Sequence, residues 1–186
     1  MAQSKKGGTR SLPLALEMLA TDHRKVEKLF EMYEDEKEGD EETKRGLAQK
    51  MCGALTAHAP LEEELLYPWL RENMDETEKV EEAYVEHAGA KDLIAQIEGA
   101  TEIDEAYDAK VKVLSEYIKH HVKEEENEIF TEVKDMKEEL DELGQEMAAR
   151  KVELMEELGL SDDDTSAQAT SRGGRGSRPG EQRGTR

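Results

Sequence analysis

Four of the five histidines in this chain fall in the middle of apolar stripes, where an unpartnered polar side chain is costly to bury. Residues three and four positions apart share one face of a helix, and each stripe follows that spacing. His120 is rotated by about 100° from the stripe that contains its neighbour. The histidines that we expect to point inward are His23, His58, His87 and His121.

Two glutamates follow these histidines at the spacing of one helical turn. Glu62 comes four residues after His58, and Glu125 comes four residues after His121. Such pairs project from one side of a helix, so each can bring a nitrogen and an oxygen to a single point. Burying two ionised carboxylates is costly unless a positive charge compensates them. The pattern therefore predicts a site where four imidazoles and two carboxylates hold two metal cations.

A single histidine and glutamate pair would be weak evidence, because Asp and Glu make up 46 of the 186 residues. Glu27 also follows His23 by four residues, and it is the reserve metal candidate. A lone histidine on an apolar stripe is more often a hydrogen-bonded core residue than a ligand. One such histidine in each of four helices favours a metal site. Nitrogen and oxygen donors without thiolate suit iron or manganese, with zinc less diagnostic.

The elements that must position these side chains are long helices. Apolar residues recur at intervals of three and four, and no stretch shows sustained alternation. We predict an all-α fold: an up-down-up-down four-helix bundle over residues 11–133, with an additional C-terminal helix within residues 134–160. Pro60 is expected to kink the second helix. The predicted helices span about 12–37, 41–72, 76–98, 103–133 and 137–158.

The two ends of the chain contain few apolar side chains. We therefore predict that residues 1–10 form a disordered N-terminus and that residues 161–186 form a disordered basic tail. The tail contains five arginines, and a flexible segment is favoured over a weak nucleic-acid contact.

The composition also excludes several classes of partner. The net charge of −20 repels phosphate backbones and anionic lipid, so we expect neither nucleic acid nor membrane to bind the core. No apolar run reaches the length of a membrane span, and Glu17 interrupts the run that imitates a signal peptide. A single cysteine, Cys52, cannot form an internal disulfide, which fits a cytoplasmic protein.

Four segments together resemble one known family, the hemerythrin-like HHE cation-binding domains. They are TDHRKVEKLFEMYE, HAPLEEELLYPWL, YVEHAGAKDLIAQIE and HHVKEEENEIF, and the resemblance covers about residues 12–133. It implies a non-haem centre of two iron ions with an oxo or hydroxo bridge, with manganese and zinc less favoured. It further implies that His23 and His58 serve one iron, His87 and His121 serve the other, and Glu62 and Glu125 bridge them.

The sequence departs from the oxygen-carrying members at one position. Those proteins have a second histidine one turn after the third-helix histidine, and this chain has Lys91 there. Reversible oxygen carriage is therefore disfavoured, and both metals keep a position for a small ligand. Lys91 either hydrogen-bonds a bound oxygen species or extends its ammonium to solvent. Tyr84, one turn before His87, is a second pocket candidate, although core packing is the favoured interpretation. No catalytic residue is assigned.

Three functions remain in competition. The leading one is a di-iron protein that binds or turns over peroxide, O2 or NO, with catalase-like peroxide disproportionation as the first reaction to test. The second is an iron, oxygen or NO sensor without turnover. The third is a metal-free helical interaction module. The oligomeric state is either monomer or homodimer, because the partner of the apolar face on the fifth helix is not defined by the sequence.

Overall fold

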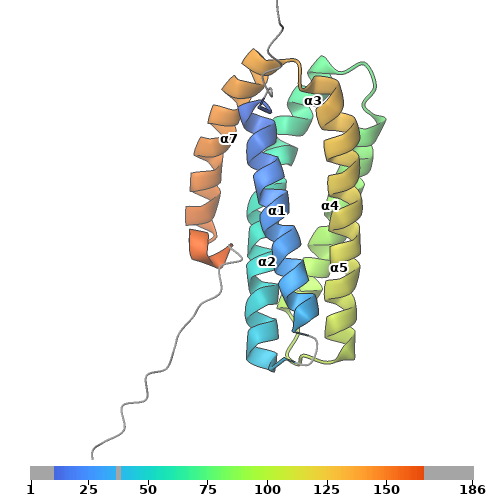
Figure 1. Ribbon diagram of the computed structural model, residues 1–186, viewed down its shortest axis with the longest axis vertical. Coiled ribbons are helices and arrows are strands. Elements are labelled where there is room, and N and C mark those ends of the chain that lie inside the picture. The colour runs from blue at the N-terminus through green and yellow to red at the C-terminus, as the bar shows by residue number, and fades with distance from the viewer. Residues whose placement is uncertain (1–10, 37–38, 166–186) are drawn as a thin grey trace, which may run out of the picture.

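The computed structural model describes residues 11–36 and 39–165, and this part of the chain contains helices and no β-strand. Four antiparallel rods, each a single helix or a continuous run of helices, form a bundle, and a fifth helix lies along its outside (Figure 1). The predicted all-α bundle with an additional C-terminal helix is confirmed. The elements are α1 (Leu14–Asp35), α2 (Glu41–Leu61), η1 (Glu62–Leu66), α3 (Tyr67–Asn73), α4 (Glu78–Glu98), α5 (Glu105–Glu124), η2 (Glu125–Ile129), α6 (Phe130–Val133), α7 (Lys137–Glu157) and η3 (Asp162–Asp164).

Local signals in the sequence set several helix ends. The Asp40 carboxylate accepts a hydrogen bond from the Thr43 N–H at 2.9 Å, which caps the N-terminus of α2. Asp104 caps α5 in the same way, and Gly99 ends α4 where the sequence predicted a stop. Pro13 precedes α1, and its side chain makes no capping hydrogen bond.

The second and fourth rods are not uniform helices. In both rods, one turn widens into a π-helix, η1 after α2 and η2 after α5, before α-helical geometry resumes. Pro60 lies inside α2, two residues before η1, and the rod continues past it to Asn73. The sequence predicts an effect of Pro60 on this rod, but it does not predict a π-helix in either one.

The bundle interior consists of two apolar clusters along its length. The lower cluster contains residues from the second half of α1, the first half of α2, the second half of α4 and most of α5. The upper cluster contains residues from the start of α1, from α3, α6 and α7, and from the first half of α4. Six buried histidines and glutamates belong to neither apolar cluster, and the four rods of the bundle supply them: His23, His58, Glu62, His87, His121 and Glu125.

The additional helix α7 packs beside α1 and α2 (Figure 1). Gly144 permits the close approach, because a Cβ at this position would lie 2.6 Å from the Ala15 backbone nitrogen. Asp141 accepts a hydrogen bond at 2.8 Å from the Leu14 N–H, so α7 caps the start of α1. The ion pair between Arg150 and Glu64 adds a third link between α7 and the bundle.

Part of the predicted tail is described by the structure. Residues 161–165 follow α7 and include the short helix η3, so the described chain extends beyond the predicted boundary at 160. The predictions of disorder for residues 1–10 and 166–186 lie outside the described residues. Within the described ranges, no helix combines the length and the apolar character that crossing a bilayer requires.

Candidate metal centre

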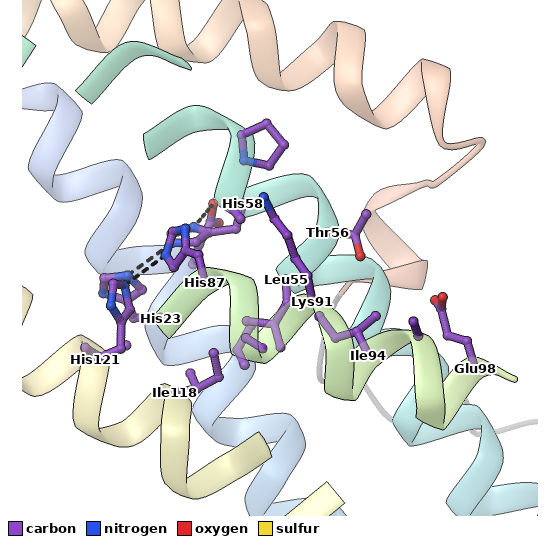
Figure 2. Close-up of a pocket in the computed structure, with 17 residues that line it drawn as sticks. His23, Leu55, Thr56, His58, His87, Lys91, Ile94, Glu98, Ile118 and His121 are labelled. Atoms are coloured by element: carbon purple, nitrogen blue, oxygen red, sulfur yellow. Dashed lines mark hydrogen bonds and ion pairs between the residues drawn. The ribbon is translucent and has the colours of Figure 1, made fainter. Parts of the chain in front are cut away.

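The four inward histidines meet at mid-height of the bundle, one from each of its four rods (Figure 2). His23 lies on α1, His58 on α2, His87 on α4 and His121 on α5, and each is between 3% and 6% exposed. The Nε2 atoms of His23 and His58 are 3.2 Å apart, and those of His87 and His121 are 3.3 Å apart. The structure thus brings together the four side chains that helical periodicity placed on inward faces.

Glu62 lies between the two pairs of histidines. Its Oε1 is 2.9 Å from the His58 Nε2 and 3.7 Å from the His23 Nε2. Its Oε2 is 3.3 Å from the His87 Nε2 and 4.0 Å from the His121 Nε2. One carboxylate oxygen therefore faces each pair, which is the arrangement of a carboxylate that can bridge two cations.

Glu125 approaches the same cluster with one oxygen. Its Oε2 is 3.4 Å from the His23 Nε2 and 3.9 Å from the His121 Nε2, so it contacts one histidine of each pair. Glu62 and Glu125 are at most 1% exposed, and none of their four carboxylate oxygens accepts a hydrogen bond within the described residues. Two acids are thus buried against imidazole nitrogens.

The two π-helical turns begin at these glutamates. The Glu62 carbonyl accepts a hydrogen bond from the Tyr67 N–H, and the Glu125 carbonyl accepts one from the Phe130 N–H, five residues later in each case. The wider turn changes the helical register beyond the metal candidates. Tyr67 and Phe130 consequently cover the histidines and glutamates on the side of the upper apolar cluster. The Tyr67 ring centroid is 5.6 Å from that of His87, and the Phe130 ring centroid is 6.3 Å from that of His23.

A second set of acids orients the imidazoles from outside. The Nδ1 atoms of three histidines hydrogen-bond to carboxylates: His23 to Glu126 at 2.9 Å, His87 to Glu63 at 2.8 Å and His121 to Glu86 at 3.0 Å. When Nδ1 donates its proton to a carboxylate, Nε2 keeps a free lone pair for a cation. These three rings are therefore held in the tautomer that binds metal.

The fourth ring, that of His58, is held more loosely. The Asp22 carboxylate is 3.7 Å from the His58 Nδ1, too far for a hydrogen bond but close enough for an ion pair. Lys151 on α7 and Lys25 both pair with Asp22. The additional C-terminal helix thus reaches the surroundings of the cluster through Lys151.

Each of the other outer acids also has a cationic group beside it. Lys91 pairs with Glu63 at 2.6 Å, and Arg24 pairs with Glu126. His120 Nε2 lies 3.5 Å from Glu86, although that ring carries a charge only when protonated. Each inward imidazole is therefore followed outward by an acid and then by a basic side chain.

The cluster repeats within the chain. A constant offset of 63 residues relates His58, Glu62 and Glu63 to His121, Glu125 and Glu126. An offset of 64 residues relates Asp22 and His23 to Glu86 and His87. The same cross-bundle contacts recur in both halves, because Glu63 meets the histidine of α4 and Glu126 meets the histidine of α1. The site therefore has approximate two-fold symmetry.

Comparison with known proteins agrees with this geometry. The hemerythrin HHE cation binding domain matches residues 14–133, which is more than half of the chain. The chain belongs to the hemerythrin HHE family. The match includes all four inward histidines and both buried glutamates of this HHE domain.

A curated relative extends the comparison. The HHE chain is 28% identical over 145 residues to a protein described as a DNA nickase from Nostoc sp. (strain PCC 7120). The aligned region is 77% of this chain and 40% of that relative, so this chain spans about two fifths of the length of the protein it matches. No solved structure matches the chain.

The buried acids of this HHE domain have opposite electrostatic tendencies. Burial would raise the pKa of Glu62, but the neighbouring imidazoles of His58, His23 and His87 outweigh burial and hold the pKa well below its usual range. Burial and the charge of Glu62 raise the pKa of Glu125 well above its usual range. The chain alone therefore supports one ionised acid in the cluster, and further positive charge is needed to ionise the second.

The histidine closest to Glu62 also responds to these charges. Burial would lower the pKa of His58, yet Glu62 and Asp22 outweigh burial and raise that pKa to about 9. Without a metal, His58 therefore carries a proton at neutral pH. A cation at this position must displace that proton, so metal binding and protonation compete for the same imidazole.

The residues of the HHE domain fit a pair of metal cations. His23, His58 and Glu62 place one donor atom each within 4.8 Å of one another, and Glu62, His87 and His121 do the same. The orphaned oxygens of Glu62 and Glu125 are acceptors that lack a donor. One cation at each histidine pair would be held by the imidazoles and by the orphaned carboxylate oxygens, and nitrogen and oxygen donors suit iron.

The other candidates from the sequence lie elsewhere. Glu27 pairs with Arg24 at 2.8 Å and belongs to neither three-residue group of buried metal candidates. The Tyr84 hydroxyl donates to the Glu63 backbone carbonyl at 3.0 Å, so it supports η1 and does not face the cluster. The Lys91 ammonium is bound to Glu63, and its side chain is 52% exposed.

Sequence reasoning missed a tyrosine and the outer acids. The Tyr67 hydroxyl is buried 3.3 Å from the His87 Nε2, and burial together with the charges of Glu62 and Glu125 raises the pKa of Tyr67, so the hydroxyl stays protonated. Two signals pointed to this shell. A second acid follows each buried glutamate, and an acid precedes both His23 and His87. Because Asp and Glu are so frequent in this chain, those patterns did not identify the outer acids until the fold was known.

Proposed function

We propose that this HHE domain holds two iron ions in the buried cluster and binds or turns over small oxygen-derived species. His23 and His58 would serve one ion, His87 and His121 the other, and Glu62 and Glu125 would bridge them, with an oxo or hydroxo group completing the bridge. The observation that carries the proposal is the pair of buried glutamates: none of their four oxygens accepts a hydrogen bond within the described residues, and three of the four lie within 3.4 Å of an imidazole nitrogen.

Iron is preferred to manganese and zinc. The cluster offers nitrogen and oxygen donors, and the single cysteine, Cys52, belongs to the lower apolar cluster. This donor set suits a first-row metal that exchanges electrons with oxygen species. Family membership supports a cation site in the same region of the chain.

The reaction to test first is disproportionation of hydrogen peroxide, in which two peroxide molecules yield two water molecules and one O2. The iron pair, when bound, would supply the two electrons that one peroxide accepts and that the other restores. The protein side chains would orient the imidazoles and exclude water. Glu63, Glu86 and Glu126 fix the imidazole tautomers, and the buried ring of Phe130 restricts access of water on the side of the upper apolar cluster. Tyr67 keeps a hydroxyl proton that can be donated to a small ligand near His87.

The first experiment is anaerobic loading of the full chain with ferrous iron, removal of excess metal and elemental analysis. The proposal expects about two iron per chain. Oxygen release from added peroxide is then measured on the loaded protein and on Glu62→Ala, which loses the carboxylate that faces both histidine pairs. Absence of bound iron after loading would overturn the site and leave the metal-free interaction module.

A sensor gives a different outcome in the same experiment. Two bound iron ions with little oxygen release, together with a large rise in melting temperature, would identify an iron, oxygen or NO sensor. That outcome retains the iron site and rejects the turnover.

The relative described as a DNA nickase provides a second candidate activity. The net charge of −20 opposes binding to a phosphate backbone, so we expect no nicking by the described core. Incubation of iron-loaded protein with supercoiled plasmid tests this directly, with free iron at the same concentration as the control. Nicking that exceeds the control and disappears in Glu62→Ala would establish the second activity.

A further inference from the structure

A cavity of about 320 Å³ lies directly beside the four histidines, inside the lower half of the bundle. Figure 2 shows His23, His58, His87 and His121 grouped at one end of the residues that line it, with Ile94 and Glu98 at the other. The walls between these ends are aliphatic. The main wall residues are Val26, Leu55, Ala90, Ile94, Ile118 and Val122.

The cavity reaches the surface between α2 and α4. Thr56 on α2 is half-buried, and Lys91, Ala95 and Glu98 on α4 are exposed, while all four also line the cavity. The opposite side of the cluster has no such space, because Tyr67 and Phe130 are buried there at 0% and 3% exposure. A molecule that enters between α2 and α4 therefore reaches the cluster from one side only.

This space is larger than the proposed small ligands require. A dry apolar cavity of ~150 Å³ already holds a benzene molecule, and sites for organic ligands begin at roughly 300 Å³. Peroxide, O2 and NO each contain two heavy atoms. They also gain little from aliphatic walls, whereas an alkyl chain gains from every methylene that it buries there.

We propose that the cavity binds an unbranched aliphatic carboxylate, with its chain between α2 and α4 and its carboxylate at the metal cluster. The proposal rests on the proposed iron site, because the metal ions supply the positive charge that attracts the carboxylate. At the mouth of the cavity, Glu98 carries a negative charge, which repels a carboxylate. The ammonium of Lys91 is already bound to Glu63. The charged end therefore lies inward and the methyl end lies toward the mouth.

The metal dependence of binding follows from the same charges. Without metal, a carboxylate ligand would meet the buried carboxylate of Glu62, and within the described residues only imidazoles lie beside that carboxylate to offset its charge. A neutral alcohol of the same chain length meets no such repulsion. The carboxylate should therefore bind the iron-loaded chain more tightly than the metal-free chain.

The test is a chain-length series of acetate, butyrate, hexanoate and octanoate, titrated calorimetrically into the full-length, iron-loaded protein. Binding should tighten by roughly fourfold for each added methylene, the equivalent of about 0.8 kcal/mol per buried CH₂. Octanoate should show at least about tenfold weaker binding to the metal-free chain, whereas octan-1-ol should bind both forms equally. Affinity that is independent of chain length would overturn the proposal, and so would equal binding of octanoate to both forms.

Two cavity-filling substitutions locate the chain. Ala90→Leu adds bulk to a wall one turn after His87, and Ile94→Phe adds it further from the metal cluster. Both should weaken octanoate by at least about tenfold and leave acetate nearly unchanged. Ala88→Leu is the matched control, because Ala88 is exposed on the same helix and does not line the cavity. Octanoate binding that survives both substitutions in folded, iron-loaded protein would overturn the proposal.

The iron content of each sample separates this inference from the proposed function. A chain that takes up no iron contradicts the proposed function. A chain that takes up two iron ions and binds octanoate no better than acetate contradicts only the aliphatic ligand. Circular dichroism and the melting temperature of each variant show whether it is folded, so a lost signal in a folded variant reports on the cavity.

Discussion

The two halves of the cluster differ at single residues. Tyr67 and Phe130 occupy equivalent positions 63 residues apart, so a hydroxyl lies beside His87 and only a hydrocarbon ring lies beside His23. Lys91 and Glu27 are equivalent at an offset of 64 residues and carry opposite charges. The two histidine pairs therefore have chemically distinct surroundings despite the repeated histidines and glutamates. We expect a small ligand to bind at the His87 and His121 position, where Tyr67 can donate a hydrogen bond.

Substitution Glu125→Gln should separate metal affinity from folding. The amide keeps the shape of the side chain but cannot ionise, so metal affinity should fall by roughly 100-fold, at the upper end of what loss of a single metal-supporting group costs. In the metal-free chain, burial and Glu62 raise the pKa of Glu125, so a neutral amide should leave the melting temperature unchanged or higher.

Iron content and melting temperature measured with and without metal check this prediction. Glu128→Gln is the matched control, because Glu128 lies in the same π-helical turn and its side chain is 53% exposed. A metal-free variant that melts far below the metal-free parent would contradict the assignment of Glu125 as an acid whose pKa is raised in the metal-free cluster.

The protonation of His58 predicts a pH dependence. Its pKa in the metal-free fold is raised to about 9 from an ordinary 6.5, so its stabilising effect is complete below pH 6.5 and disappears as the pH rises through 9. The same proton must leave when metal binds. Because His58 alone accounts for one displaced proton, apparent ferrous affinity should rise by about tenfold or more per pH unit between pH 7 and 9.

Anaerobic competition with a chelator of known affinity at pH 7, 8 and 9 measures this slope, after correction for the protonation of the chelator. The stability of the metal-free chain should move in the opposite direction over the same range. Metal affinity that does not change with pH would show that no proton is displaced from the cluster.

At the scale of elements, α7 approaches α1 more closely than a side chain at Gly144 would allow. A Cβ there would lie 2.6 Å from the backbone nitrogen of Ala15 and 2.8 Å from the Leu14 Cβ. Gly144→Val should therefore displace α7 and lower the free energy of unfolding by about 1–3 kcal/mol. Because Lys151 on α7 pairs with Asp22 beside His58, metal affinity should also fall.

Urea unfolding of the variant and of Gly46→Ala provides the comparison. Gly46 lies inside α2, and a Cβ added there would have no atom within 4 Å, so alanine at this position should stabilise the chain by up to about 1 kcal/mol. Equal behaviour of the two variants would show that the contact between α7 and α1 is not tight in solution.

The π-helical turns are the second feature at this scale. Both start at a buried glutamate of the cluster and end before an aromatic residue that covers it. An added residue in one turn shifts every later side chain by about 100° around the helix axis. The turns thus allow Glu62 and Tyr67, five residues apart, to reach the same cluster, which a regular helix would not permit.

For the whole molecule, the cluster of buried histidines and glutamates lies between two apolar layers, and its six residues belong to neither layer. Removal of metal should therefore lower the melting temperature without unfolding the chain, because the residues of both layers remain buried. A metal present at 100 times its dissociation constant contributes about 2.7 kcal/mol, and this corresponds to a shift of about 5–10 °C for a chain of this size.

Calorimetry before and after chelation measures the shift, while far-ultraviolet circular dichroism follows helix content. Loss of helix content on chelation at 25 °C would show that the two layers do not hold the fold alone. An unchanged melting temperature would show that no cation was bound in the cluster.

The amino-acid sequence alone determined the helical class, the number of long rods and the face on which each inward histidine lies. These properties depend on spacing within a single helix. His58 and Glu62 share a face because they are four residues apart, and His121 was distinguished from His120 by the same period. The resemblance of four segments to one family implied that these helices form one bundle around one site. The family match over residues 14–133 shows that the chain belongs to that family.

Only the tertiary structure decided how the rods face one another. Glu126 reaches His23 across 103 residues of chain, and nothing in the sequence distinguished that acid from the many others at the surface. The π-helical turns and the cavity between α2 and α4 likewise depend on interhelical packing. The period of apolar residues describes only one helix at a time, so it does not predict either feature. Contacts between distant residues follow from the positions of whole helices. Those positions depend on how all the helices together bury apolar side chains and provide partners for buried polar groups.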